Sequence, residues 1–194
     1  MQRLCVFCGS CRGEGEVYAD AAKRLGRSLA EHGIGLVFGA GHVGLMGVLA
    51  DAVLEAGGKA IGVIPQALVD KELAHSALAE LRVVSTMHER KALMADLSDG
   101  FAALPGGYGT GDELFEILTW AQLGLHSKPI GLLNTSGFFD PLLAWLDHAV
   151  QERFIRPQHR ELLCVAESPE ELLRLMMQCR PTPDVGKWID AADR

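Results

Sequence analysis

The chain has 194 residues, of which 48% are hydrophobic and 22% are charged, and its net charge is −7. This length fits one domain with a full core. The negative charge argues against a nucleic-acid or an acidic membrane partner, because both require a basic surface. No apolar stretch is long enough to span a membrane, and the apolar run at the start is too short for a signal peptide, so we expect a cytoplasmic protein.

Short apolar segments alternate with longer segments of helical spacing. In chain order we predict a strand at 3–8, a helix at 16–33, a strand at 34–39, a helix at 43–58, strands at 59–65 and 81–85, a helix at 87–99, a strand at 100–106, a helix at 113–124, a strand at 128–134, a helix at 141–155, a strand at 161–166 and a helix at 168–179. The strands are apolar on both faces, which is typical of a parallel sheet that is covered on both sides. We therefore predict a single doubly wound, Rossmann-like α/β domain over residues 1–180 and a polar tail at 181–194.

Three glycine-containing turns follow predicted strands, at the edge where such sheets bind ligands. Each leads into a helix N-terminus, where free N–H groups favour an anion and missing side chains let a phosphate approach. Taken singly, each is as well explained as an ordinary tight turn, and GAGHVG lacks the acidic residue of a dinucleotide fingerprint. Together they predict a phosphorylated ligand, most simply a nucleotide. The residues are Gly9, Ser10, Gly13 and Gly15; Gly39, Gly41, Gly44 and Gly47; and Gly106, Gly107, Gly109 and Thr110.

Charged residues accompany the third turn. If Thr110 caps the next helix, Glu113 completes a T-x-x-E capping box in its first turn. Glu113 can equally face the ligand, with Glu116 one turn further along the same face. Arg90 and Lys91 fall early in the preceding helix, where cations oppose the helix dipole. An anionic ligand would offset that cost, and a solvated basic pair is the alternative.

Cys5, Cys8 and Cys11 form a C-x2-C-x2-C pattern that invites a metal or iron–sulfur interpretation. Against it, Cys5 and Cys8 would point to opposite faces of a strand. The other two cysteines, Cys164 and Cys179, lie in unrelated segments without ligand spacing. We therefore expect reduced thiols and no metal.

Several of these segments resemble one known family. PGGYGTGDE fits PGGxGTxxE, MHERK precedes it at the usual distance, and GAGHVGLMG is similar to GGGxxGLMG; VFCGS, GVIP, TWAQLGLHSKPIGLLN and GFFDPLLAWLD also match. The chain thus resembles the LONELY GUY family, cytokinin riboside 5′-monophosphate phosphoribohydrolases that are often mislabelled lysine decarboxylases. The resemblance implies a Rossmann-like homodimer that cleaves the N-glycosidic bond of a nucleoside 5′-monophosphate, releasing the base and ribose 5-phosphate.

The resemblance also implies roles for individual residues. It makes Arg90 and Glu113 the catalytic pair, and it makes Lys91 and Glu72 substrate contacts. The remaining substrate-binding candidates belong to the glycine turns: Gly9, Ser10, Gly39, Gly41, Gly106, Gly107, Tyr108, Gly109, Thr110, Gly111 and Asp112. Three departures from the family pattern are Ala40 for a glycine, Cys11 for a serine, and Gly111-Asp112 for Leu-Glu. We expect the Ala40 methyl group to narrow the nucleotide site and Gly111 to loosen the helix start.

Three alternatives remain at this point. An AMP nucleosidase would perform the same chemistry on plain AMP, and a non-catalytic nucleotide-binding or carrier protein could share the fold. An amino-acid decarboxylase would need pyridoxal phosphate on a lysine, but Lys59, Lys91 and Lys128 lack a recognisable context for it. We therefore expect a nucleoside 5′-monophosphate substrate and no cofactor.

Overall fold

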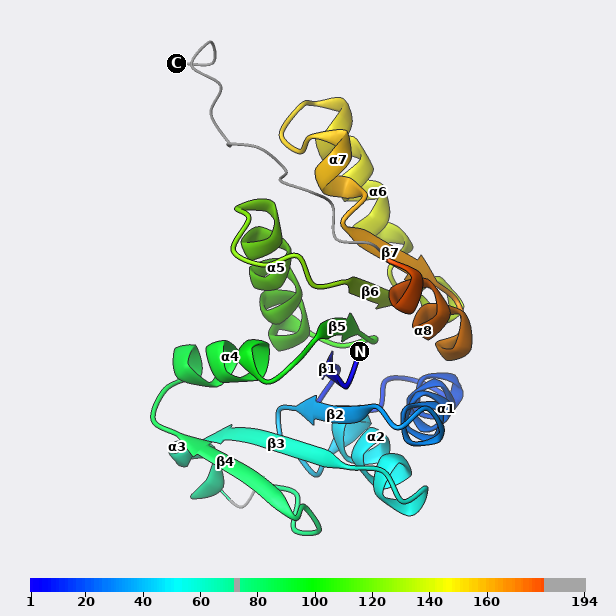
Figure 1. Cartoon of the computed structure of the whole chain (residues 1–194). Coiled ribbons are helices and arrows are strands. Elements are labelled where there is room, and N and C mark those ends of the chain that lie inside the picture. The colour runs from blue at the N-terminus through cyan, green and yellow to red at the C-terminus, as the bar shows by residue number, and fades with distance from the viewer. Residues whose placement is uncertain (72–73, 180–194) are drawn as a thin grey trace.

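The structure is a computed structural model that describes residues 1–71 and 74–179. Its centre is a seven-stranded sheet in the order β4-β3-β2-β1-β5-β6-β7, in which every pairing is parallel (Figure 1). The polar tail expected at 181–194 lies outside the described residues. The strands are β1 (Arg3–Phe7), β2 (Gly35–Phe38), β3 (Ala60–Pro65), β4 (Glu80–Val84), β5 (Gly100–Ala103), β6 (Ile130–Leu133) and β7 (Leu163–Ala166).

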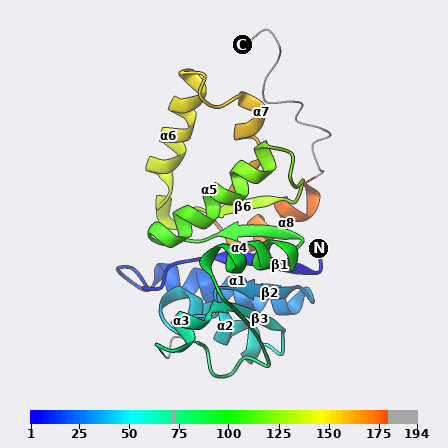
Figure 2. The same ribbon diagram turned by 90° about the vertical axis from the view of Figure 1, so that its left-hand side faces the viewer.

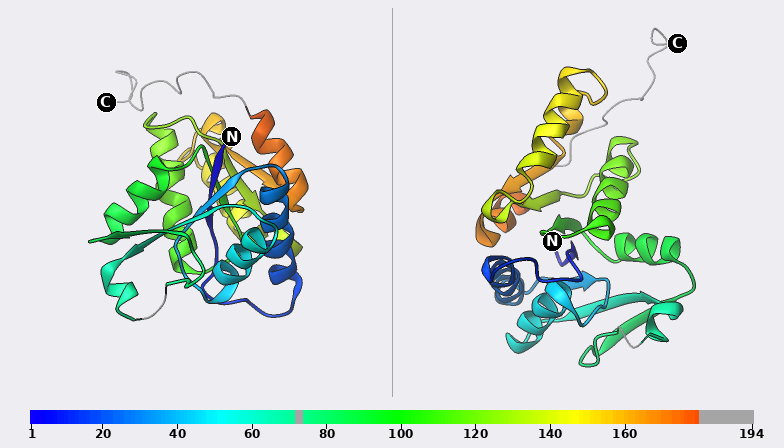
Figure 3. Two further views of the ribbon diagram at one scale, coloured as in Figure 1. Left: turned by 60° about the horizontal axis from the view of Figure 1, so that its bottom comes forward. Right: turned by 180° about the vertical axis from the view of Figure 1, so that it is seen from behind.

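Helices cover both faces of the sheet, as predicted. In Figures 1 and 3, α1, α2 and α8 lie on one side and α4 and α5 on the other. Buried residues form two corresponding clusters, one around α1, α2 and α8 and one around α4, α5 and α6. The helices are α1 (Val17–Glu31), α2 (Gly44–Glu55), α3 (Gln66–Val69), α4 (Met87–Asp96), α5 (Tyr108–Gln122), η1 (Thr135–Gly137), α6 (Asp140–Gln151), α7 (Pro157–Arg160) and α8 (Pro169–Gln178).

The direction of winding reverses at the centre of the sheet. From β1 the chain moves outward through β2, β3 and β4, and then returns to the other side of β1 with β5, β6 and β7. Leu4 of β1 pairs with Leu36 of β2 and with Gly100 of β5. The loops that leave β1 and β5 therefore separate toward opposite faces, which creates the crevice where doubly wound proteins bind ligands. Figure 2 shows the helices α4 and α5 in front of these central strands.

The N-terminal cysteines lie on both sides of the central strand. Cys5 packs into the cluster beneath α4 and α5, whereas Cys8 packs into the cluster beneath α1 and α2. Burial raises the pKa of both thiols, and the charge of Glu113 raises them further. The sequence places Cys164 and Cys179 in unrelated segments. In the structure, Cys164 in β7 and Cys179 at the end of α8 are neighbours whose side chains share a hydrogen bond. In the described part of the chain, no three His, Cys, Asp or Glu side chains form a group that could hold a metal ion.

The expectation that every strand is buried on both faces is wrong for β4. Leu81 and Val83 are 36% and 47% exposed, whereas β7, the other edge strand, keeps Leu163 and Ala166 buried. The apolar side chains of this five-residue segment predict a core strand, because the segment itself does not show which elements will cover it. Among residues 1–71 and 74–179, no helix has both the length and the apolar character needed to cross a membrane.

Candidate active site

The three glycine turns meet at the carboxyl edge of the sheet, as the sequence predicts. The N–H of Gly9 donates to the carbonyl of Pro105 at 3.0 Å, which joins the turns after β1 and β5. The N–H of Leu45 donates to the carbonyl of Gly9 at 2.9 Å, which adds the turn after β2. Gly44 has φ +63°, and a Cβ there would collide with the Ser10 backbone. Close packing between the turns thus requires some of these glycines whether or not a ligand binds.

Three glycines at the start of α5 face open space. A Cβ at Gly107, Gly109 or Gly111 would meet no atom within 4 Å, whereas a Cβ at Gly106 would collide with the Thr110 side chain. Gly107 is the N-cap of α5, and Gly109 and Gly111 are among its first four residues. Since internal packing does not exclude a side chain there, the bare backbone is free for close approach by a ligand.

The start of α5 differs from the prediction. The helix begins at Tyr108 with Gly107 as N-cap, and no side chain caps it. Thr110 is therefore inside the helix and buried against Gly106, and Glu113 is its sixth residue, so the Thr110–Glu113 capping box is wrong. Without a side-chain cap, the first-turn N–H groups of α5 are available to an anion.

A capping box does occur at the start of α4. The Thr86 hydroxyl accepts a hydrogen bond from the Glu89 N–H at 3.1 Å, and the Glu89 carboxylate accepts one from the Ser85 N–H at 2.8 Å. The same T-x-x-E signature is visible in the sequence at 86–89. Arg90 and Lys91 are the fourth and fifth residues of this helix, just past the turn where we had expected their charge to be unfavourable.

Arg90 and Glu113 form a buried ion pair between α4 and α5. The Arg90 Nη1 donates to Glu113 Oε1 at 2.8 Å, and both side chains are 10% exposed. The Arg90 Nε donates to the carbonyl of Val63, within β3, at 3.1 Å. The guanidinium lies directly against Gly39, where a Cβ would collide with Nη2. Two strands, β2 and β3, and two helices therefore determine where this guanidinium sits.

Two opposing effects act on the pKa of the Glu113 carboxyl. Burial raises its pKa above the ordinary value, and the charge and hydrogen bond of Arg90 oppose that rise. The net direction is upward, so part of the desolvation remains uncompensated in the free protein. A cation arriving beside this carboxylate would be stabilised by it.

Lys91 forms a second pair on the outer side of α5. Its Nζ lies 3.0 Å from Asp112 Oδ2 and 3.1 Å from Glu116 Oε1. Burial would lower the pKa of Lys91, but the hydrogen bonds and charges of Asp112 and Glu116 outweigh burial and raise it. Lys91 is therefore a fixed cation, and its partner Glu116 lies about one helical turn along α5 from Glu113.

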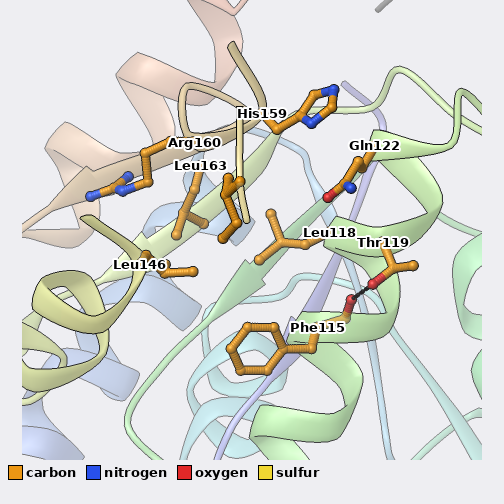
Figure 4. A pocket seen from close by; sticks show the side chains of 9 residues that line it. Phe115, Leu118, Thr119, Gln122, Leu146, His159, Arg160 and Leu163 are labelled. Carbon is orange, nitrogen blue, oxygen red and sulfur yellow. Dashed lines mark hydrogen bonds between the residues drawn. The ribbon is translucent and has the colours of Figure 1, made fainter. Parts of the chain in front are cut away.

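A pocket of about 250 Å³ adjoins the start of α5. Ser10 and Arg12 from the turn after β1 form one wall, and Gly106 and Gly107 form another. Arg90 and Glu113 do not line it. A second pocket, shown in Figure 4, lies among α5, α6, α7 and β7 and measures only about 70 Å³. It contains none of the predicted site residues, and its volume is well below the several hundred Å³ typical of ligand sites.

The remaining predicted residues have varied positions. The Cβ positions at Gly39 and Gly41 are filled by Arg90 and Met46, so packing already explains both glycines. Ala40 is fully buried, and its methyl group lies against Gly62 in the core rather than narrowing an open site. Tyr108 is completely exposed in the isolated chain. Glu72 lies outside the described residues.

Sequence reasoning missed two side chains next to this site. His75 is buried, and its Nε2 lies 3.0 Å from Asp51 Oδ1 of α2. The N–H of His75 donates to the carbonyl of Ala40 at 2.8 Å, beside the turn that supports Arg90. A single histidine in a segment without helical or strand periodicity gives no sequence signal for such a contact.

Comparison with known proteins shows a close match in sequence. The family model described as "Possible lysine decarboxylase" matches residues 46–176. The cytokinin riboside 5′-monophosphate phosphoribohydrolase LOG of Oryza sativa subsp. japonica is 49% identical over 190 residues, which cover 97% of this chain and 78% of that protein. The enzyme of the same name, LOG3, of Arabidopsis thaliana is 48% identical over 180 residues, which cover 93% of this chain and 84% of that protein.

Solved structures confirm the fold. A molybdenum cofactor binding protein from Rippkaea orientalis superimposes with a TM-score of 0.69 at 22% identity, covering 91% of this chain and 96% of that one. The molybdenum cofactor carrier protein of Chlamydomonas reinhardtii gives a TM-score of 0.68 at 24% identity, covering 91% and 95%. At these identities the likeness concerns the architecture and not the ligand.

Proposed function

This chain belongs to the LONELY GUY family, and on that premise we propose that it hydrolyses the N-glycosidic bond of N6-modified adenosine 5′-monophosphates, releasing the free base and ribose 5-phosphate. The curated relatives carry the name of this activity at 48–49% identity over almost the whole chain. The observation that carries the proposal in this molecule is the buried Arg90–Glu113 pair beside an uncapped helix N-terminus.

The start of α5 suits the phosphate end of such a substrate. Gly107 and Gly109 leave the backbone bare, and the first-turn N–H groups have no acceptor within the helix. Ser10 of the adjoining pocket can add a hydroxyl, and Arg12 a charge. Charge-assisted hydrogen bonds of this kind contribute roughly 1.5–3 kcal/mol each. That binding energy would fix the distant glycosidic bond relative to α5.

Glu113 supplies the electrostatics of bond cleavage. As the C1′–N9 bond breaks, its electron pair leaves with the base and positive charge develops on the ribose. A carboxylate beside C1′ stabilises that charge more in the transition state than in the ground state. Water then forms the new C1′–O bond and loses one proton. The departing base gains one proton, so the charges balance. Arg90 holds the carboxylate in place and opposes the effect of burial on its pKa.

Lys91 and Asp112 would bind the substrate rather than perform the reaction. Lys91 is already paired with Asp112 and Glu116, so it can exchange one carboxylate for a substrate oxygen without being newly desolvated. The other glycine-turn candidates have no side chain to offer the substrate. We propose that Gly9, Gly39, Gly41 and Gly106 shape the site through packing and backbone position. A preference for N6-substituted forms over plain AMP belongs to this proposal as well.

We further propose a homodimer. Large apolar side chains are exposed beyond the end of α5 and along and just beyond α6, where Leu125, Trp145 and Phe154 are 69%, 55% and 82% exposed. A second copy of the chain would cover them. Sedimentation of the wild type and of Phe154→Glu tests this, because a monomeric wild type contradicts it. No disulfide joins the cysteines of the described residues, which fits a reducing cytoplasm, and a fluorescent fusion reports that location.

The activity itself is tested with four substrates. Purified protein is incubated with AMP, N6-isopentenyl-AMP and the two matching nucleosides, and the released bases are separated by chromatography. We expect the nucleotides to be cleaved at least about a thousandfold faster in kcat/KM than the nucleosides, a factor that needs only about 4 kcal/mol of phosphate interaction. Equal rates for nucleoside and nucleotide would contradict the phosphate role of α5. Release of no base from any of the four would leave a nucleotide carrier instead.

A further inference from the structure

Residues 74–78 lie against the turn that follows β2. Ala74 forms an antiparallel bridge with Gly41, and the N–H of His75 donates to the carbonyl of Ala40 at 2.8 Å. These contacts add a short strand-like pairing at the carboxyl edge of the sheet. The turn after β2 is therefore held from outside by a segment more than thirty residues away in sequence.

The His75 side chain anchors this segment to α2. Its ring is buried, with the residue 7% exposed, and Nε2 lies 3.0 Å from Asp51 Oδ1. The N–H of Ala77 donates to Nδ1 at 3.3 Å, so Nδ1 is the acceptor and the ring hydrogen resides on Nε2, which donates to Asp51. Both ring nitrogens are thus used, one toward α2 and one toward its own backbone. The ring ties residues 74–78 to α2, and the backbone of the same residues holds the turn after β2.

That turn needs external support. Ala40 has φ +61°, a left-handed conformation that is unfavourable for a residue with a Cβ. Its carbonyl is the acceptor for His75, so the pairing with residues 74–75 helps to maintain the strained backbone. Loss of this pairing would allow the turn to relax.

The same turn supports the guanidinium of Arg90. Gly39 lies so close to Arg90 Nη2 that no side chain fits between them. The other contacts of that guanidinium are the Val63 carbonyl and Glu113. Movement of the Gly39 backbone would therefore shift Arg90 and, through the 2.8 Å hydrogen bond, the Glu113 carboxylate.

We propose that His75, held by Asp51, is a positioning residue for the Arg90–Glu113 pair. The inference rests on the proposed catalytic role of that pair. His75 braces the Gly39–Gly41 turn, the turn seats Arg90, and Arg90 orients the carboxylate on which cleavage depends. A misplacement of about 1 Å at a catalytic group can lower a rate by about a hundredfold, so a partial loss of support is measurable.

The test compares two buried histidines. His75→Ala removes the brace, and His159→Ala removes a ring that is also buried, at 6% exposed, but lies in α7 at the small pocket of Figure 4. For each variant, kcat and KM are measured with N6-isopentenyl-AMP, and ribose 5-phosphate binding is measured by calorimetry. We expect His75→Ala to lower kcat at least about tenfold with ribose 5-phosphate binding within threefold of wild type. His159→Ala should keep kcat within threefold.

Two further variants keep the proposal falsifiable if His75→Ala fails to fold. Asp51 is largely exposed, so Asp51→Ala should fold and should lower kcat at least about threefold. His75→Gln retains a donor for Asp51 and should recover part of the lost kcat. An unchanged kcat in Asp51→Ala and His75→Ala, or an equal loss in His159→Ala, would overturn the positioning role. Full activity in Arg90→Ala would instead overturn the catalytic pair itself, so the two failures are distinguishable.

Discussion

Replacing Glu113 by glutamine removes the charge of the carboxylate while preserving its shape. In the native protein Glu113 is 10% exposed and accepts a hydrogen bond from Arg90 at 2.8 Å. An amide oxygen can accept the same hydrogen bond, so Arg90 need not lose its partner. The substitution therefore separates the charge of residue 113 from its position.

The expected size of the effect follows from Coulomb's law. A carboxylate about 4 Å from a developing unit charge contributes about 4 kcal/mol at the effective dielectric constant of about 20 that suits protein sites. Losing that stabilisation from the transition state corresponds to about a thousandfold in kcat. Because Glu113 is buried and solvent screening is weak there, we expect Glu113→Gln to lower kcat by at least about a hundredfold. Binding of ribose 5-phosphate should persist, since the start of α5 is untouched.

The assay is release of N6-isopentenyladenine from its nucleotide, followed by chromatography, with thermal unfolding as the measure of folding. The matched control is Glu170→Gln, which breaks an Arg–Glu pair of 2.6 Å with Arg24 that is more than half exposed. Exposed pairs contribute about 0–1 kcal/mol, so this control should keep both its activity and its stability. A folded Glu113→Gln variant with near-normal turnover would refute the electrostatic role and leave the Arg90–Glu113 pair as a structural contact.

Three further predictions concern the same site. Lys91→Ala should raise KM more than it lowers kcat, because Lys91 is a fixed cation paired with Asp112 and Glu116 rather than with Glu113. Steady-state kinetics measure both constants. A wild-type KM would mean that the cluster of Lys91, Asp112 and Glu116 is purely structural. Gly109→Ala should stabilise α5 by about 1 kcal/mol, seen as a higher Tm, and yet raise KM for nucleotides, because its Cβ occupies space that is open in the free protein; a higher Tm with unchanged KM would show that no phosphate approaches there. Finally, because burial raises the pKa of Glu113 despite Arg90, the native protein binds this proton more tightly than the unfolded chain. The stability of the wild type relative to Glu113→Gln should therefore fall as pH rises from the ordinary glutamate pKa through the raised one, and kcat should rise over the same interval. Urea unfolding measures the first and the pH–rate profile the second. Opposite slopes would contradict this.

The architecture could be derived from the sequence because it depends on local composition. Short apolar runs alternating with helical spacing lead to a parallel sheet with helices on both faces, and the strand ends then bring the glycine turns to one edge. The opposite orientation of Cys5 and Cys8 follows from the twofold period of a strand. Each of these features requires only a segment and its immediate neighbours.

Tertiary structure decided the features that depend on contacts between segments. T-x-x-E occurs at 86–89 and at 110–113, but only Thr86 caps a helix, because Thr110 packs against Gly106 and lies inside α5. The exposure of β4 depends on which elements pack against its faces, since β7 is also an edge strand and is largely buried. The 2.8 Å contact of Arg90 with Glu113 and the anchoring of His75 by Asp51 join residues 23 and 24 positions apart, and no local pattern encodes such distances. The family resemblance named Arg90 and Glu113 as a pair, but only the packing of α4 and α5 over the ends of β2 and β3 shows what holds them together.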